Sequence, residues 1–186
     1  MSFTWKQRLI LPSKIEEVAE QIRSKNKTIV YTAGAWDMLH VGQVRYLHEA
    51  KKLADVLVVG VSSNRTVSKL KGPNRPILDE KIRAEMLSYI RFVDLVTIVP
   101  EVSNQPTLAQ LQPDFYVTVR EDWNDGYQDS PEYHTVTEYG GKVELVDRQS
   151  PFISTTQILK KSASAQINEV LKDFMGEMKS PLGDKK

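Results

Sequence analysis

Apolar residues recur along the chain at two different spacings, which predict alternating helices and strands. The segment 13–25 has its apolar residues at helical spacing, and Ser13 followed by Glu16 fits a capping box at a helix start. The residues that share one face of this helix are Ile15, Val18, Ala19 and Ile22. The first predicted element is therefore an amphipathic helix.

Five short apolar runs predict strands. They lie at residues 28–33, 56–62, 95–99, 115–119 and 143–146. In the run 56–62 the apolar residues are continuous and do not alternate with polar ones, which is typical of a strand covered on both faces. This pattern favours a parallel sheet.

Helix-start signals stand between these strands. Helices are predicted to begin near Gly42, after Asp79, at Ser130-Pro131 and at Ser154. Gly140 can end the helix that begins at Ser130-Pro131. The residues expected to face inward are Val44, Leu47 and Ala50 in the first of these helices, and Ile82, Met86, Leu87 and Ile90 in the second.

Strands that alternate with helices imply βαβ units with right-handed crossovers. The predicted fold class is therefore α/β, a Rossmann-like doubly wound parallel sheet. Residues 1–175 are expected to form a single domain with an N-terminal helix at 13–27, a core at 28–165 and a flexible tail at 176–186. Ligands of such folds bind at the carboxyl ends of the strands, so chemistry is expected directly after each strand.

Composition narrows the classes of function. The chain has 186 residues and a formal net charge of +1, which disfavours a nucleic-acid-binding protein because such proteins carry a strongly basic surface. It has no cysteine, so disulfides and thiolate metal sites are excluded, and no His, Asp or Glu spacing suggests a metal site. No apolar run approaches the roughly 18 residues that cross a bilayer. We therefore expect a cytoplasmic protein without membrane or nucleic-acid partners.

The segment after the first strand, GAWDMLHVGQ, carries the first candidate chemistry. Gly34 allows a ligand to approach the backbone, and His40 and Gln43 stand three residues apart at the start of a helix. There they can face one ligand beside free backbone N–H groups, which suits a phosphate. A helix start with an incidental histidine explains these ten residues equally well.

Two further segments carry groups that suit phosphate. Lys69, Lys71 and Arg75 fall within the basic loop 69–76, although a solvated basic turn would look the same. Near the end of the chain, Arg148 precedes the hydroxyl residues Ser154, Thr155 and Thr156 at a helix start. Such hydroxyls bind phosphate oxygens or cap the helix, and capping is the commoner role.

Taken in order, GAWDMLHVGQ, LKGPNRP, Arg83 in the next helix, RFVDLV, EYGGKVELV and ISTT resemble the cytidylyltransferase-like HxGH nucleotidyltransferases. Within that superfamily the match is to the D-glycero-β-D-manno-heptose 1-phosphate adenylyltransferase type, over roughly residues 13–165. Glycerol-3-phosphate cytidylyltransferases are a more distant match, strongest at ISTT. The resemblance implies transfer of a nucleoside monophosphate, AMP in preference to CMP, from a nucleoside triphosphate to a sugar phosphate, with release of pyrophosphate.

The resemblance also implies roles for individual residues. The catalytic residues would be His40, Gln43 and Lys71. The nucleotide would contact these and also Ala33, Gly34, Ala35, Trp36, Arg148, Ser154, Thr155 and Thr156. The acceptor would contact Asp37, Lys69, Arg75, Arg83, Arg120 and Asp122, although a structural hydrogen bond explains Asp37 equally well. Mg²⁺ would bind with the triphosphate, ATP or CTP, and relatives of this type are commonly homodimers.

Two positions depart from the family pattern. Gln43 stands where the second histidine is usual, and the segment 118–123, TVREDW, replaces a glycine-containing loop. Glutamine still donates hydrogen bonds but cannot become a cation. A slower enzyme and a non-catalytic binding protein for a nucleotide or sugar phosphate are both consistent with these changes.

Overall fold

The computed structural model describes residues 4–122, 126–149 and 154–179, and their strands form one parallel sheet. The strands are β1 (Leu9–Ile10), β2 (Ile29–Gly34), β3 (Val56–Ser62), β4 (Leu95–Val99), β5 (Phe115–Val119) and β6 (Lys142–Val146). Their order across the sheet is β1-β4-β3-β2-β5-β6. β2 thus lies between β3 and β5, and the winding direction reverses there. The predicted doubly wound, Rossmann-like α/β fold is confirmed.

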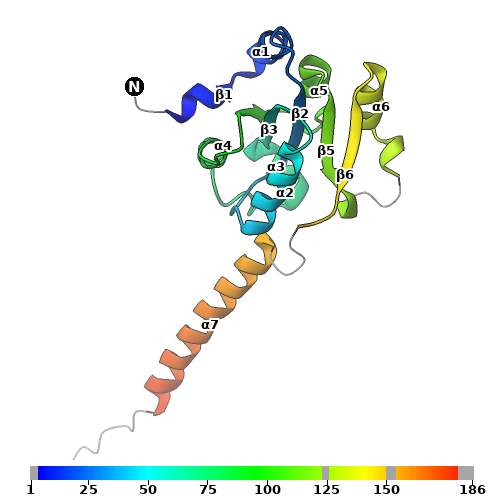
Figure 1. The fold of residues 1–186 in the computed structure, drawn as a ribbon. Coiled ribbons are helices and arrows are strands. Elements are labelled where there is room, and N and C mark those ends of the chain that lie inside the picture. The colour runs from blue at the N-terminus through cyan, green and yellow to red at the C-terminus, as the bar shows by residue number, and fades with distance from the viewer. Residues whose placement is uncertain (1–3, 123–125, 150–153, 180–186) are drawn as a thin grey trace, which may run out of the picture.

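Helices cover both faces of this sheet (Figure 1). The α-helices are α1 (Ile15–Arg23), α2 (Val41–Lys51), α3 (Asn64–Lys71), α4 (Glu80–Ser88), α5 (Gln105–Leu111), α6 (Pro131–Glu138) and α7 (Thr155–Lys179). Short 3₁₀ turns are η1 (Trp5–Arg8), η2 (Pro12–Lys14), η3 (Arg120–Asp122) and η4 (Tyr127–Asp129). α7 leads away from the body of the molecule (Figure 1), and among the described residues no helix has the length and hydropathy needed to span a membrane.

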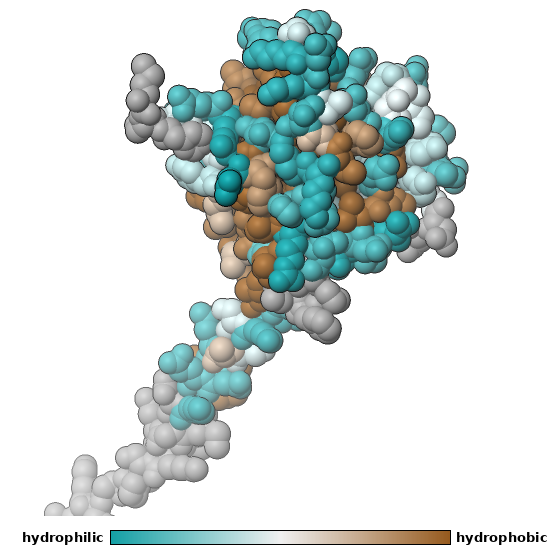
Figure 2. All heavy atoms as spheres, in the orientation of Figure 1, coloured by the Kyte–Doolittle hydropathy of each residue, from teal (hydrophilic) through white to brown (hydrophobic). Residues whose placement is uncertain are grey.

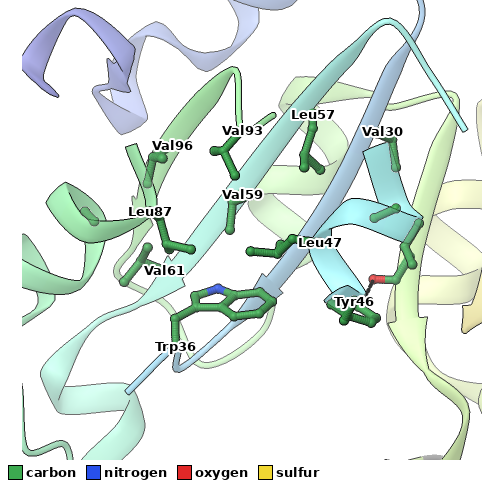
Figure 3. Packing of buried hydrophobic residues seen from close by; sticks show 13 residues of the cluster. Val30, Trp36, Tyr46, Leu47, Leu57, Val59, Val61, Leu87, Val93 and Val96 are labelled. Atoms are coloured by element: carbon green, nitrogen blue, oxygen red, sulfur yellow. Dashed lines mark hydrogen bonds between the residues drawn. The ribbon is translucent and has the colours of Figure 1, made fainter. Parts of the chain in front are cut away.

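Each face of the sheet has its own hydrophobic core. On one face Leu47 of α2 and Leu87 of α4 pack with strand residues such as Val59, and Figure 3 shows Trp36 beside this cluster. On the other face α1, α5 and α6 pack against alternate strand residues such as Tyr31 and Val58. Hydrophilic residues cover much of the outer surface of the helices in view (Figure 2). A sheet buried on both faces explains the continuous apolar run predicted as a strand at 56–62.

Most predicted elements agree with the structure, and the caps at Asp79 and Ser130 are confirmed. Asp79 Oδ1 accepts a hydrogen bond from the Lys81 N–H at 2.9 Å, and Ser130 Oγ accepts one from Tyr133 N–H at 3.2 Å. The capping box predicted at Ser13 is wrong, because α1 has Lys14 as its N-cap and no side-chain cap bond. Among the described strands and α-helices, β1, α3 and α5 have no counterpart among the predicted elements.

Two further expectations are corrected. Ile82 and Met86 were expected to face inward, but both are exposed on α4, whose buried face carries Ala84 and Leu87. The tail was expected to begin at residue 176, but α7 runs to Lys179. The remaining tail residues, together with Trp123 and Ile153, lie outside the described residues.

Candidate active site

A pocket of about 330 Å³ opens at the carboxyl ends of β2 and β5, where the strand order reverses. This is the location at which doubly wound sheets bind ligands, and the volume is at the small end of ligand pockets. The lining residues are Ala33, Gly34, Ala35, Trp36, Asp37, His40, Gly42, Gln43, Tyr46, Lys71, Arg75, Thr118, Val119, Asp122, Arg148, Gln149, Ser154, Thr155 and Thr156. Segments from across the whole chain therefore meet in one place.

Residues 35–40, called here the β2 loop, are held by the buried carboxylate of Asp37. Asp37 is 1% exposed, and its Oδ2 lies 2.9 Å from Arg75 Nε and 2.8 Å from Arg75 Nη2. The same carboxylate accepts hydrogen bonds from the backbone N–H groups of Ile77 and Leu78 at 2.9 and 3.0 Å. Its backbone carbonyl accepts one from Thr155 Oγ1 at 2.8 Å. Asp37 thus ties the β2 loop to the basic segment and to the start of α7.

Trp36 fixes the same loop from the core side. Its indole N–H donates to the Gly60 carbonyl at 2.8 Å, and its ring lies 6.1 Å from that of Tyr46. Figure 3 shows the Trp36 and Tyr46 side chains next to each other. A Cβ on Gly34 would lie 3.1 Å from the Trp36 ring, a close contact that requires the indole to shift by a few tenths of an ångström. Trp36 and Met38 both have φ of 51°, a strained conformation that occurs preferentially at functional sites.

His40 and Gln43 meet at the first turn of α2. The backbone N–H of His40 donates to Gln43 Oε1 at 3.1 Å, and both residues line the pocket. His40 Nδ1 is buried and, within the described part of the chain, has no hydrogen-bond partner. Burial, and then the positive charge of Arg148, lower the pKa of His40 from its ordinary value. Both effects favour the neutral form of the imidazole.

The basic segment was expected to be a loop from Lys69 to Pro76, but its first part is helical. α3 continues through Lys71 and ends at Gly72, whose φ of 95° favours glycine. Lys71 and Arg75 then reach the pocket from the two sides of this turn. Partial desolvation, and then the neighbouring Arg75, lower the pKa of Lys71. Asp122 and Asp37 act in the opposite direction, so burial is the main cause of the lowered pKa.

The opposite wall is the β5 loop, residues 120–122, together with the chain after β6. Asp122 accepts a hydrogen bond from Arg148 Nη2 at 2.8 Å, and the Glu121 carboxylate accepts from the Arg148 N–H at 2.9 and 3.0 Å. Arg120 instead pairs with Asp147 at 2.9 Å. These ion pairs are largely exposed, so each contributes little to stability.

Three residues predicted to contact the acceptor lie away from the pocket. Arg83 is fully buried, and its guanidinium donates to the carbonyls of Leu78 and Ala35 and to Asn64 Oδ1. Arg83 therefore supports the β2 loop from behind. Lys69 lines a separate hollow between α3 and residues 100–102, and Arg120 donates to Asp147.

The other predicted residues are brought together, and the pocket adds some that were not predicted. The additions are Gly42, Tyr46, Thr118, Val119 and Gln149. Tyr46 lies one residue before the predicted inward position Leu47, and its hydroxyl donates to the Val117 carbonyl at 2.9 Å. Thr118 and Val119 are the last residues of a predicted strand, and this position at the carboxyl end of a strand could have identified them as pocket residues.

The described residues contain no group of three His, Cys, Asp or Glu side chains that could hold a metal ion. Asp37 is saturated by Arg75 and by two backbone N–H groups, and Asp122 is paired with Arg148. The carboxylates of the pocket are thus already engaged. Such a site fits a metal ion that arrives with its own phosphate ligands better than one held by protein alone.

Comparison with known proteins gives a family match and several relatives. The cytidylyltransferase-like family model matches residues 31–163. The bifunctional protein HldE of Syntrophotalea carbinolica is 35% identical over 158 residues, covering 83% of this chain and 31% of the relative. The HldE of Campylobacter jejuni subsp. doylei is 38% identical over 146 residues, covering 78% and 30%. The chain thus spans about a third of the length of these curated relatives.

Solved structures show the same fold. A lipopolysaccharide core biosynthesis protein from Thermoplasma volcanium is 27% identical with a TM-score of 0.54, covering 66% of this chain and 96% of that one. A pantoate-beta-alanine ligase from Francisella tularensis is 15% identical with a TM-score of 0.51, covering 88% of this chain and 79% of that one. At this identity the second likeness concerns the fold alone.

Proposed function

The chain belongs to the cytidylyltransferase-like family, and from this premise we propose that it is a nucleotidyltransferase that joins a nucleoside monophosphate to a sugar phosphate and releases pyrophosphate. The observation that carries the proposal is the pocket where β2 and β5 end. There Lys71, Arg75 and Arg148 converge from separate segments on the start of α2. Cations beside a helix N-terminus suit a polyphosphate.

The proposed reaction needs little proton chemistry. A phosphate oxygen of the acceptor attacks the α-phosphorus, the new P–O bond forms, and the bond to the bridging oxygen breaks with its electrons leaving on pyrophosphate. The attacking oxygen is already ionised, so no general base is required, and catalysis consists of positioning and charge stabilisation. This agrees with a pocket in which burial and Arg148 lower the pKa of His40 and so favour its neutral form.

Each basic residue of the pocket would have its own role in positioning the substrates and stabilising charge. Lys71 would stabilise charge that develops on the phosphate oxygens, because its ammonium group is a cation that lines the pocket. Arg75 is oriented by Asp37, and Arg148 approaches from the opposite wall, where it would contact the nucleotide. Ser154, Thr155 and Thr156 at the start of α7 would hold the phosphate tail. Mg²⁺ would be carried by the phosphates and water, where it neutralises part of their charge.

We further propose AMP in preference to CMP as the transferred group, with a sugar phosphate such as heptose 1-phosphate as acceptor. The support is the resemblance of GAWDMLHVGQ after β2, LKGPNRP at the end of α3, RFVDLV at the start of β4 and EYGGKVELV through β6 to heptose 1-phosphate adenylyltransferases, together with the relatives named HldE. The name of the Thermoplasma volcanium protein, which refers to lipopolysaccharide core biosynthesis, points the same way. By the same resemblance we propose that the chain forms a homodimer.

A second candidate is a protein that binds the nucleotide or sugar phosphate without turnover. Gln43 and the altered β5 loop favour it. Loss of one preorganised donor to a transition-state oxygen costs about 10²–10³ in rate, and a glutamine that still reaches that oxygen costs less. We therefore propose an active enzyme that is slower than a relative with histidine at this position.

Pyrophosphate release tests the proposal. The natural protein and Gln43→His would be incubated with Mg²⁺ and either ATP or CTP, with heptose 1-phosphate or glycerol 3-phosphate as acceptor. We expect release with ATP and heptose 1-phosphate, and faster release by Gln43→His. Activity in Gln43→His alone would favour the binding protein. Release with CTP and glycerol 3-phosphate would favour the cytidylyltransferase alternative. If neither protein released pyrophosphate, the result would contradict the proposed acceptors.

A further inference from the structure

We propose that α7 docks on helix α4 of a second copy of this chain, so that two chains exchange their C-terminal helices around a two-fold axis. Each of the two apolar helix faces described below is then covered by the other one from the partner. The inference rests on the proposed homodimer and names its contact. It does not depend on which reaction the pocket catalyses.

The first apolar face is a stripe on α7. Ile167, Val170 and Leu171 are three or four residues apart, which places them on one side of the helix, and they are 59%, 67% and 51% exposed. Ile167 lies about 18 Å along the helix from Thr155, and α7 leads away from the body of its own chain (Figure 1). An amphipathic helix gains most of its stability from packing of its apolar side. The stripe therefore requires a partner from outside its own chain.

The second apolar face is on α4. Ile82 and Met86 are one helical turn apart and are 49% and 38% exposed. Their apolar pattern in the sequence is typical of a core-facing side, yet the core side of α4 is occupied by Ala84 and Leu87. α4 thus has two apolar sides, and the fold of a single chain covers one of them.

The two faces match in pattern and in the sign of their charge. Both carry side chains three or four residues apart, the arrangement in which the ridges of one helix pack into the grooves of another. α7 carries four lysines and three acidic residues. α4 carries two glutamates and one lysine outside the core, because its Arg83 is fully buried. A net positive helix is attracted to a net negative one and is repelled by its own copy, so α4 fits α7 better than a second α7 does.

A two-fold axis lets one kind of contact cover both faces. In such a dimer α7 of each chain meets α4 of the other, so the contact occurs twice. This doubling matters because a stable interface buries about 800 Å² on each partner, which a few side chains on one pair of helices do not supply. A pair formed by the two α7 helices alone would leave Ile82 and Met86 exposed.

Sedimentation velocity tests whether both faces hold the dimer together. We expect the natural protein to be a dimer at micromolar concentration. Val170→Glu and Met86→Glu each place an unpaired carboxylate in the contact, so each should raise the dimer dissociation constant about 100-fold or more. A natural protein that is monomeric would overturn both this contact and the homodimer. A dimer that survives either substitution would overturn this contact and leave the homodimer in place.

Ala165→Glu is the matched control. It adds the same charge to α7, but residue 165 precedes Ile167 by two positions and so lies on the opposite side of the helix, about 160° away. We expect its dissociation constant to equal that of the natural protein. An equal weakening by Ala165→Glu and Val170→Glu would show that added charge, and not the apolar stripe, governs assembly, which would overturn the proposal.

Crosslinking identifies which helices meet. The chain has no cysteine, so one introduced thiol is unique. When affinity-tagged Val170→Cys and untagged Met86→Cys chains are mixed, a short bis-maleimide should join them, whereas Ala165→Cys and Met86→Cys should stay separate. Joining of Val170→Cys to itself would indicate a pair of α7 helices. A link within one chain of the double variant Met86→Cys/Val170→Cys would indicate that α7 folds back on its own body. Either result would overturn the proposal.

These measurements use neither nucleotide nor turnover, so they stand apart from the proposed reaction. A protein that releases pyrophosphate as a monomer keeps the proposed function and loses this contact. A crosslinked dimer without pyrophosphate release does the reverse. Vesicles that contain phosphatidylglycerol test one other occupant of the stripe. If the natural protein is monomeric and sediments with these vesicles, and Val170→Glu does not, then α7 binds a membrane surface and the proposal is overturned.

Discussion

The two walls of the pocket are built in different ways. The β2 loop is held by the buried Asp37 carboxylate, by the Trp36 indole and from behind by Arg83. The β5 loop is held by ion pairs whose side chains are mostly exposed, with 58% and 76% exposure for Arg120 and Asp147. One wall is thus fixed by groups that cannot reach water, and the other by groups that can exchange their partners for water.

This difference has a physical consequence for the site. Breaking a buried, hydrogen-bonded ion pair costs about 3–5 kcal/mol, whereas an exposed pair is worth about 0–1 kcal/mol. The β2 loop is therefore suited to chemistry that requires fixed geometry, as at the triphosphate. The β5 loop can adjust to a ligand at small cost, which suits recognition of an acceptor. The described part of the family departure, residues 118–122, falls on the adjustable wall.

The largest effect is expected from Asp37→Ala. The variant leaves the Arg75 guanidinium and the N–H groups of Ile77 and Leu78 without their acceptor, so we expect a loss of about 3 kcal/mol in the free energy of unfolding. Urea denaturation measures it. The matched control is Asp147→Ala on the exposed Arg120 pair, expected to cost less than about 1 kcal/mol. Equal losses in the two variants would remove the distinction between the walls.

Gly34→Ala is expected to have the next largest effect. The new Cβ would lie 3.1 Å from the Trp36 ring, which must shift and strain its hydrogen bond to Gly60. We expect a loss of about 1–2 kcal/mol and a changed indole fluorescence. Gly126→Ala, at an exposed glycine with φ of −104°, should leave the thermal midpoint nearly unchanged. An unshifted midpoint and spectrum in Gly34→Ala would show that the β2 loop accepts the added methyl group without strain.

Arg148→Ala should affect binding more than folding. Its pair with Asp122 is exposed, so unfolding free energy should change by less than about 1 kcal/mol. Nucleotide affinity should fall about tenfold or more, since a hydrogen bond to a charged group is lost. Asp122→Ala is the paired control, because it removes the ion-pair partner of Arg148 and should not lower the affinity for the nucleotide. Calorimetry with MgATP would contradict this assignment if both variants bound equally well.

A smaller effect concerns pH. The pKa of His40 is lowered from its ordinary value of 6.5, first by burial and then by Arg148. The unfolded chain therefore takes up this proton more readily than the native protein, and His40 costs stability as the pH falls below about 6.5. The drop in thermal midpoint between about pH 7 and pH 5 should accordingly be smaller in His40→Asn than in the natural protein. An identical drop would mean that His40 titrates as a solvent-exposed residue does.

The sequence by itself determined the parts that depend on local pattern. The strands at 56–62, 95–99 and 115–119, the caps at Asp79 and Ser130, and the placement of His40 and Gln43 on one helical turn follow from residues close together in the chain. Parallel strands present their carboxyl ends at the same edge of a sheet, so local pattern also located the pocket. The phosphate-binding roles of these residues stay predictions.

Only the tertiary structure decided which side chains reach the pocket. Lys69 and Lys71 are two residues apart, so on the unpredicted helix α3 they point in different directions, and only Lys71 lines the site. Arg83 is drawn inward by the carbonyls of Ala35 and Leu78, and Asp37 by Arg75. Folding brings these partners together, and the spacing of residues in the sequence does not predict them. A buried charged side chain requires hydrogen-bond or ion-pair partners, and the whole fold determines which groups become those partners.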